Sequence, residues 1–284
     1  MDLILLLAAL VILGAGAGLV GSLAGLGGGL VIVPLLVVVF QVPLVDAIGA
    51  SAVSVLATSA TTGAAYVEDR LTDVRIGMFL EIATVPGALL GVIATLALAR
   101  LGLASALLVL LGIILLATLP GSWRRRDARD LPPPPPDARS RRLGLRGIYH
   151  DPRLGRDIEY QAGRTTPALA TMFGAGIVSG MFGIGSGVLK VLALERFLGL
   201  PLKVATATSN FMIGVTVAAS AGVLLLAGDV NPVLIAPVAL GTVAGSYLGS
   251  RILPGLSSTI LRLIFLGVVA VLAAELIARG VGLG

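Results

Sequence analysis

The chain has 284 residues, of which 57% are hydrophobic and 12% are charged, whereas ordinary soluble domains have about 45–50% and about 25%. The mean hydropathy of +1.04 agrees with this, so composition argues against a soluble globular enzyme. The sequence has no cysteine and one histidine, His150. This excludes disulfides, thiolate sites and histidine-rich metal sites, and we expect no metal and no cofactor.

Long apolar stretches recur along the whole chain, and a membrane-spanning helix needs about 20 mainly apolar residues. Two further stretches, Leu30–Phe40 and Val188–Leu198, are too short to span. The first long stretch lacks the basic start of a signal peptide, so we interpret it as a mature helix. The pattern predicts an all-α polytopic membrane protein of ten helical segments. The long ones are Leu3–Leu23, Val45–Tyr66, Ile76–Ala99, Leu101–Leu119, Ala168–Phe182, Val204–Ala227, Val233–Ile252 and Ile260–Ala278.

The two halves of the sequence match each other without gaps when shifted by 158 positions. We interpret the chain as two tandem homologous halves of five helical segments: residues 1–120 form the first repeat and residues 167–284 the second. A chance match of glycine-rich apolar sequence is the alternative. The matching pairs are Gly18/Gly176, Val20/Val178, Gly25/Gly183, Gly27/Gly185, Gly29/Gly187, Pro43/Pro201, Ala47/Ala205, Ser51/Ser209, Thr58/Thr216, Gly87/Gly245 and Gly91/Gly249.

A basic, proline-rich linker, residues 121–166, joins the halves, and eleven of the twenty Lys and Arg residues lie between Arg124 and Arg164. Membrane proteins keep such residues in cytoplasmic loops, so we expect a cytoplasmic linker and no nucleic-acid partner. Pro132–Pro136 indicates a stiff polyproline run. Alternating residues on both sides of Asp151–Gly155 predict a small β-hairpin, with His150 exposed to solvent.

The distribution of charge also bears on topology. If each short stretch crosses the membrane, the halves are inverted relative to each other, and Arg70, Arg75, Arg196, Lys203 and Arg251 share the linker's side. If the short stretches are re-entrant, we expect parallel halves, with Arg196, Lys203 and Arg251 on the opposite side. The positive-inside rule favours inverted repeats.

Each half carries a glycine-rich break between a long helix and a short one. Such paired, interrupted segments are the best sequence pointer to a transporter's binding site. A helix that begins after the glycines presents free N–H groups and a positive dipole end, which suits an anion, although close helix packing is the alternative. The candidate binding residues are Gly25, Gly27, Gly28 and Gly29 in the first break, and Gly183, Gly185, Ser186 and Gly187 in the second.

Polar residues in the third helical segment of each half, counting the short one, form a second candidate group. Ser51 and Ser209 occupy equivalent positions, and Asn210 follows directly. Polar groups inside a membrane must find partners. These three residues are therefore candidates to line a cavity, or their side chains bond to carbonyls of their own helix.

Ionisable residues inside apolar segments are functional hypotheses, and Glu81 and Lys190 are the two that we single out. Glu81 is a proton-coupling candidate, with a salt link to Arg75 or to a linker arginine as the alternative. Lys190 follows the second break and is a candidate partner for an anionic substrate, or it pairs with Glu195. Glu275 and Arg279 are spaced i,i+4 and are interpreted as a surface pair.

The segments Gly25–Leu36 and Pro201–Thr216 resemble the TauE/SafE sulfite exporter family, also called the sulfonate-uptake permease family. The resemblance covers essentially the whole chain. The family's proline is kept as Pro34 in the first half, but the second half has Leu192 there and Ser186 in place of a family glycine. The resemblance implies movement of small anions, often sulfur oxyanions or organosulfonates, across a cytoplasmic membrane.

The sequence thus predicts a secondary transporter of a small anion in the cytoplasmic membrane, working by alternating access around the two breaks. No nucleotide-binding Gly-x-x-x-x-Gly-Lys-Ser/Thr motif occurs, so an ion or substrate gradient would supply the energy. A passive anion channel and a non-transporting scaffold are the alternatives. The expected partners are the anion, the lipid bilayer, a coupling proton or cation, and further copies of the chain.

Overall fold

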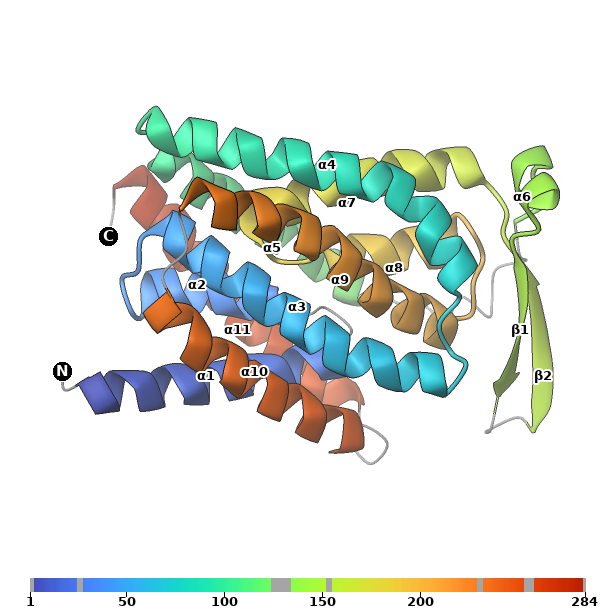
Figure 1. Ribbon diagram of the computed structural model, residues 1–284, viewed down its shortest axis with the longest axis horizontal. Coiled ribbons are helices and arrows are strands. Elements are labelled where there is room, and N and C mark those ends of the chain that lie inside the picture. Colours follow the sequence, from blue (N-terminus) through green and yellow to red (C-terminus); the bar gives the residue numbers. More distant parts are fainter. Residues whose placement is uncertain are drawn as a thin grey trace.

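The computed structural model describes residues 3–24, 28–123, 134–151, 155–228, 232–252 and 258–282. These residues form eleven helices and two strands (Figure 1). The first half contains α1 (Leu3–Ala24), α2 (Gly29–Val38), α3 (Leu44–Glu68), α4 (Val74–Arg100) and α5 (Ala104–Trp123). The linker contains α6 (Ala138–Leu143), β1 (Arg146–Asp151) and β2 (Arg156–Gln161). The second half contains α7 (Thr165–Phe182), α8 (Gly187–Arg196), α9 (Leu202–Ala227), α10 (Pro232–Ile252) and α11 (Ser258–Val281).

The apolar segments expected from the sequence form helices. Within the described residues, six of these helices are long and apolar enough to cross a membrane: α1, α3, α4, α7, α9 and α10. The helix α2 is shorter and also apolar. The protein is therefore an all-α polytopic membrane protein, as predicted.

The helices of the two halves interlock. In Figure 1, α1 and α10 form one flank, α4 and α7 form the opposite flank, and α3 and α9 lie between them. The fifth helices of the halves, α5 and α11, pack against each other. If each helix is replaced by its counterpart in the other half, the pair α1–α10 becomes α7–α4. The pairs α3–α9 and α5–α11 are unchanged. This symmetry supports the tandem repeat, which remains a prediction.

Glycines allow the flanking helices to approach closely. A Cβ on Gly14 or Gly18 of α1 would clash with Val238 or Thr242 of α10, and a Cβ on Gly87 of α4 would clash with Phe173 of α7. Because the contacting residue numbers rise together along α1 and α10, these two helices run parallel. Figure 1 shows α1 and α7 running in opposite directions, which is the orientation that inverted halves require.

The linker caps one end of the bundle. Strands β1 and β2 pair antiparallel, with Tyr149 opposite Ile158, in the hairpin that the sequence pattern indicated. The Tyr160 hydroxyl donates to Asp73 Oδ2 at 3.0 Å, and the Gly163 amide donates to the Leu198 carbonyl at 3.1 Å. The hairpin therefore contacts the first half at the start of α4 and the second half at the α8–α9 connection.

Asp137 fastens the linker to α7. Its carboxylate accepts hydrogen bonds from the Ser140 amide at 2.7 Å, and from the Thr165 amide and hydroxyl at 2.8 and 2.6 Å. Burial acts to raise the pKa of Asp137, but the hydrogen bonds from Thr165 and Ser140 and the nearby Arg139 outweigh it and hold the pKa below its ordinary value.

Candidate functional site

The two glycine-rich breaks meet inside the bundle. A Cβ on Gly29 would lie 2.7 Å from Ile184 Cα and 2.9 Å from the Gly183 carbonyl oxygen. Gly183 in turn lies against α3, since its Cβ would be 2.7 Å from the Ile48 carbonyl oxygen. Main chain therefore packs on main chain here. A side chain at Gly29 would separate the two breaks, and one at Gly183 would push the second break away from α3.

The short helices begin at these breaks with left-handed backbone. Gly28 has φ 77° before α2, and Ser186 has φ 45° before α8. Neither N-cap residue, Gly28 or Ser186, makes a side-chain capping hydrogen bond, so neither compensates the positive dipole end of its helix. Gly25 and Gly27, two of the predicted site residues, lie outside the described residues.

The predicted hydroxyl residues contact the second break. Ser51 donates to the Gly183 carbonyl at 2.9 Å, Ser209 to the Gly187 carbonyl at 3.4 Å, and Ser186 to the Ala175 carbonyl at 2.6 Å. The Asn210 carbonyl accepts from Ser59, and its buried side-chain Nδ2 has no hydrogen-bond partner. Ser51 and Ser209 thus hold the α8 break from α3 and α9, and Asn210 offers a buried donor.

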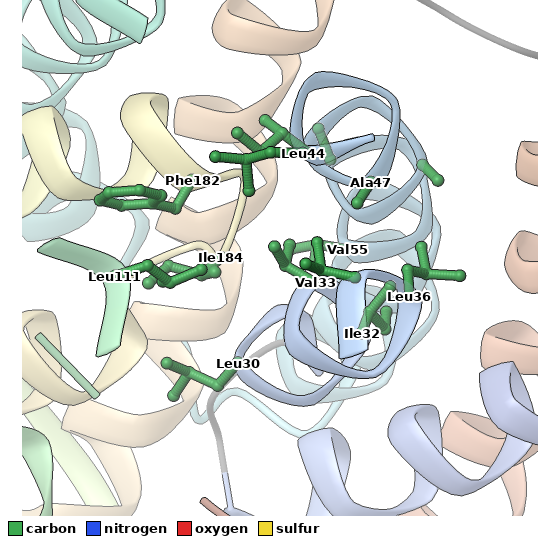
Figure 2. Packing of buried hydrophobic residues seen from close by; sticks show 14 of the residues in the cluster. Leu30, Ile32, Val33, Leu36, Leu44, Ala47, Val55, Leu111, Phe182 and Ile184 are labelled. Atoms are coloured by element: carbon green, nitrogen blue, oxygen red, sulfur yellow. The ribbon is translucent and has the colours of Figure 1, made fainter. Parts of the chain in front are cut away.

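Apolar side chains fill the space beside the breaks. Leu30 and Ile184, which adjoin the two breaks, lie in one buried cluster with Val33, Val55 and Leu111 (Figure 2). Two cavities, of about 230 and 430 Å³, are lined by other residues near Arg100 and Arg279. The described residues of the breaks, Gly28, Gly29 and 183–187, are buried, so access to them requires movement of the surrounding helices.

The two intramembrane charges lie together at the first turn of α8. Lys190 is fully buried, Glu81 is 4% exposed, and Lys190 Nζ lies 3.9 Å from Glu81 Oε1. Thr216 of α9 lies between them. Lys190 Nζ donates to Thr216 Oγ1 at 2.5 Å, and Thr216 Oγ1 lies 2.9 and 3.1 Å from the two Glu81 carboxylate oxygens. We call Glu81, Lys190 and Thr216 the charged triad.

The geometry settles several alternatives left open by the sequence. The ion-pair partner of Lys190 is Glu81, from the other half of the chain, and Arg75 donates to the Gly144 carbonyl in the linker. The interpretation of Glu275 and Arg279 as a surface pair was incomplete. Their ion pair forms at 3.0 Å, but Arg279 also donates to the Val37 and Val38 carbonyls at 3.4 and 3.1 Å and so caps the C-terminus of α2.

Sequence reasoning missed Thr216 as a site residue. It was noted only as the repeat partner of Thr58, because hydroxyls in membrane helices usually bond to their own helix. Thr216 Oγ1 does lie 2.8 Å from the Met212 carbonyl oxygen of its own helix, but it also contacts both charges. No sequence signal singled out Thr216, because its location between Lys190 and Glu81, the buried charges of opposite sign that the structure describes, follows from packing.

A helical bundle with interrupted helices that meet at its centre, beside a buried ion pair, has the features of a membrane transporter. The sequence profile of the family described as "Sulfite exporter TauE/SafE" matches residues 10–276. The chain therefore belongs to the TauE/SafE family of membrane transporters and is not an enzyme.

A curated relative supports this assignment. The chain is 29% identical over 280 residues to the "Probable membrane transporter protein YunE" of Bacillus subtilis (strain 168), and the match covers 96% of this chain and 97% of the relative. No solved structure matches the chain.

Proposed function

We propose that this protein is a secondary transporter of a small anion, a sulfur oxyanion or an organosulfonate, that works by alternating access around the two breaks. The main observation in favour is the meeting of two uncapped helix N-termini, α2 and α8, in the interior of the bundle. Helix N-termini attract anions through their free N–H groups and dipole. Lys190, in the first turn of α8, adds a full positive charge.

The interlocked arrangement of the halves favours alternating access. Each flank combines one helix from each half, α1 with α10 and α4 with α7, so the flanks can rock about the central breaks as rigid pairs. The apolar filling around Leu30 and Ile184 favours a carrier over an open channel, because a conducting pore needs a continuous wet path.

We further propose that the hairpin end of the bundle faces the cytoplasm. Besides the linker arginines, this end carries Arg70, Arg75, Arg196 and Lys203, whereas Arg100 and Arg279 lie at the other end. Positive residues concentrate on the cytoplasmic side of membrane proteins. Labelling of a single cysteine placed at position 155 of the hairpin, or at position 102 between α4 and α5, in intact cells tests this orientation.

The anion is best identified by its effect on stability, since a ligand that binds the native state raises its melting temperature. Purified protein would be heated with sulfite, thiosulfate, methanesulfonate, taurine, acetate or chloride. We expect sulfur oxyanions or sulfonates to raise Tm more than acetate or chloride. An equal response to all these anions would contradict the proposed selectivity.

Flux in proteoliposomes distinguishes a carrier from the alternatives. A carrier shows saturable uptake and accelerated counterflow when unlabelled anion is present inside. Flux that rises linearly with concentration would indicate a channel. The absence of both anion binding and flux would leave a non-transporting scaffold as the remaining interpretation.

A further inference from the structure

The charged triad forms at a contact between the halves. Glu81 comes from α4 of the first half, and Lys190 and Thr216 come from α8 and α9 of the second. All three side chains are buried. Replacing a buried ion pair with apolar residues of similar volume is often neutral or stabilising, so a requirement for stability does not explain the triad.

The place that the repeat relates to the charged triad shows that the fold accepts apolar residues there. With the shift of 158 positions, the counterparts of Glu81, Lys190 and Thr216 are Ala239, Ile32 and Thr58. Ile32 is fully buried, and Thr58 donates to the Ser54 carbonyl of its own helix at 3.0 Å. One of two equivalent places therefore carries charge and the other does not, which points to a role in transport.

The position of Lys190 favours a negatively charged partner. Lys190 lies in the first turn of α8, where the helix dipole is already positive. In the structure the Glu81 carboxylate supplies this negative charge. It therefore pairs with the same Lys190 ammonium group that an incoming anion would bind.

No other titratable group of the described residues competes for this role. Helices α5 and α7 have no titratable residue, and those of α9 and α3 lie near their ends: Lys203, Asp46, Tyr66 and Glu68. In α8, Glu195 and Arg196 lie at the end opposite Lys190, and Arg75 and Arg100 lie near the ends of α4. Glu81 is therefore the carboxylate that pairs with Lys190.

Thr216 provides a hydrogen bond that can change partner. Its oxygen accepts from Lys190, and its single hydrogen has two acceptors within reach, the Glu81 carboxylate at 2.9 Å and the Met212 carbonyl at 2.8 Å. When Glu81 leaves or becomes protonated, the hydroxyl can turn to Met212 and still accept from Lys190. Lys190 thus remains held while its ionic partner is exchanged.

We propose that Glu81 is an internal counter-ion, which the transported anion displaces from Lys190 and which then takes up a proton. Before binding, Lys190 and Glu81 carry +1 and −1. After binding, Lys190 pairs with the anion and Glu81 is a neutral acid, with its proton drawn from water on the side from which the anion entered. The charge of the site is unchanged for a monovalent anion, so one proton travels with one negative charge. This inference rests on the proposed function.

Proton uptake on anion binding tests the exchange directly. Methanesulfonate, a monoanion whose own charge does not change near neutral pH, would be added to full-length protein in weakly buffered detergent solution with a pH indicator. We expect the wild type to take up about one proton per anion bound. Anion binding without proton uptake overturns the inference but leaves the proposed function standing, whereas failure to bind any anion of the stability screen counts against the function itself.

A Glu81→Gln variant provides the second measurement. With its internal competitor removed, Lys190 should bind methanesulfonate at least about tenfold more tightly, and binding should take up no proton. A merely structural Glu81 predicts weaker binding instead, and that result overturns the inference. Glu275→Gln, which removes a carboxylate distant from the triad, is the matched control and should behave as the wild type.

The double variant Glu81→Gln/Lys190→Met provides a test if Glu81→Gln alone misfolds, because the double variant leaves no unpaired buried charge. We expect it to fold and to lose both methanesulfonate binding and proton uptake. Retention of wild-type affinity in this variant would exclude Lys190 as the cation that the anion meets.

Discussion

Gly29 and Ile184 meet at the main chain: a Cβ built on Gly29 would lie 2.7 Å from the Cα atom of Ile184. This contact joins the break before α2 to the break before α8. It leaves no room for a side chain at position 29, and neighbouring backbone cannot move aside as a flexible side chain can.

Gly29→Ala should therefore abolish anion uptake into proteoliposomes, because the added methyl group pushes the breaks apart at a cost of about 1–3 kcal/mol. Gly16→Ala in α1 is the control, since a Cβ there meets nothing within 4 Å. Both proteins should insert and purify normally. Uptake by Gly29→Ala equal to that of the Gly16→Ala control would show that the contact between the breaks is dispensable.

The packing of α4 on α7 makes a separate prediction about stability. A side chain on Gly180 would clash with the Ala88 carbonyl of α4, whereas Gly174, also on α7, has nothing within 4 Å. Gly180→Leu should lower Tm by several degrees, corresponding to overpacking of about 1–3 kcal/mol. Gly174→Leu should leave Tm unchanged in detergent, and a similar loss in both variants would argue against close α4–α7 packing.

Thr216 can be tested by comparing two substitutions. Thr216→Val removes the hydroxyl between Lys190 and Glu81, while Thr216→Ser keeps it. We expect Thr216→Val to lose the link between proton uptake and methanesulfonate binding, and Thr216→Ser to retain about one proton per anion. Identical proton uptake in the two variants would exclude the hydroxyl as the bridging group.

Arg279 should matter more than its exposed ion pair suggests. Arg279→Gln removes its charged hydrogen bonds to the Val37 and Val38 carbonyls and should destabilise the protein by roughly 1–3 kcal/mol. Glu275→Gln removes only the half-exposed pair, which is worth about 0–1 kcal/mol. Equal Tm values for the two variants would mean that Arg279 does not hold α2.

Asp137 predicts a pH effect at the linker. Because the pKa of Asp137 is lower in the folded protein than its ordinary value of 3.8, its stabilising effect is complete above that value and is lost as pH falls through the folded pKa. At neutral pH, Asp137→Ala should cost about 1 kcal/mol, as for loss of a helix cap. Faster hydrogen exchange at the Ser140 and Thr165 amides would report this loss, and the difference from wild type should vanish in strong acid.

Hydropathy was sufficient to predict the ten helices of the two halves, because membrane-spanning segments differ from loops in composition along the chain. It did not predict the short, arginine-rich α6 in the linker. The sequence also identified one glycine-rich break in each half, and in the structure Gly29 of the first break lies against Gly183 and Ile184 of the second. The filling of this region by Leu30 and Ile184 could not be predicted, since side-chain packing depends on neighbours distant in sequence.

The charged triad is a second feature that could not be predicted from the sequence. Glu81 and Lys190 each stood out as ionisable residues in apolar segments, but 109 positions separate them. Local alternatives such as Arg75 and Glu195 were therefore as plausible as partners. Only the packing of α4 against α9 and of α8 against α9 brings the two charges to Thr216.

The apolar counterpart of the triad at Ile32 and Ala239 also fixes how many routes one polypeptide offers. Under the proposed mechanism, an anion that binds Lys190 therefore meets its charged partner at one place only, where α4, α8 and α9 come together. Under the same proposal, an assembly of several copies would contain one such charged site inside each subunit.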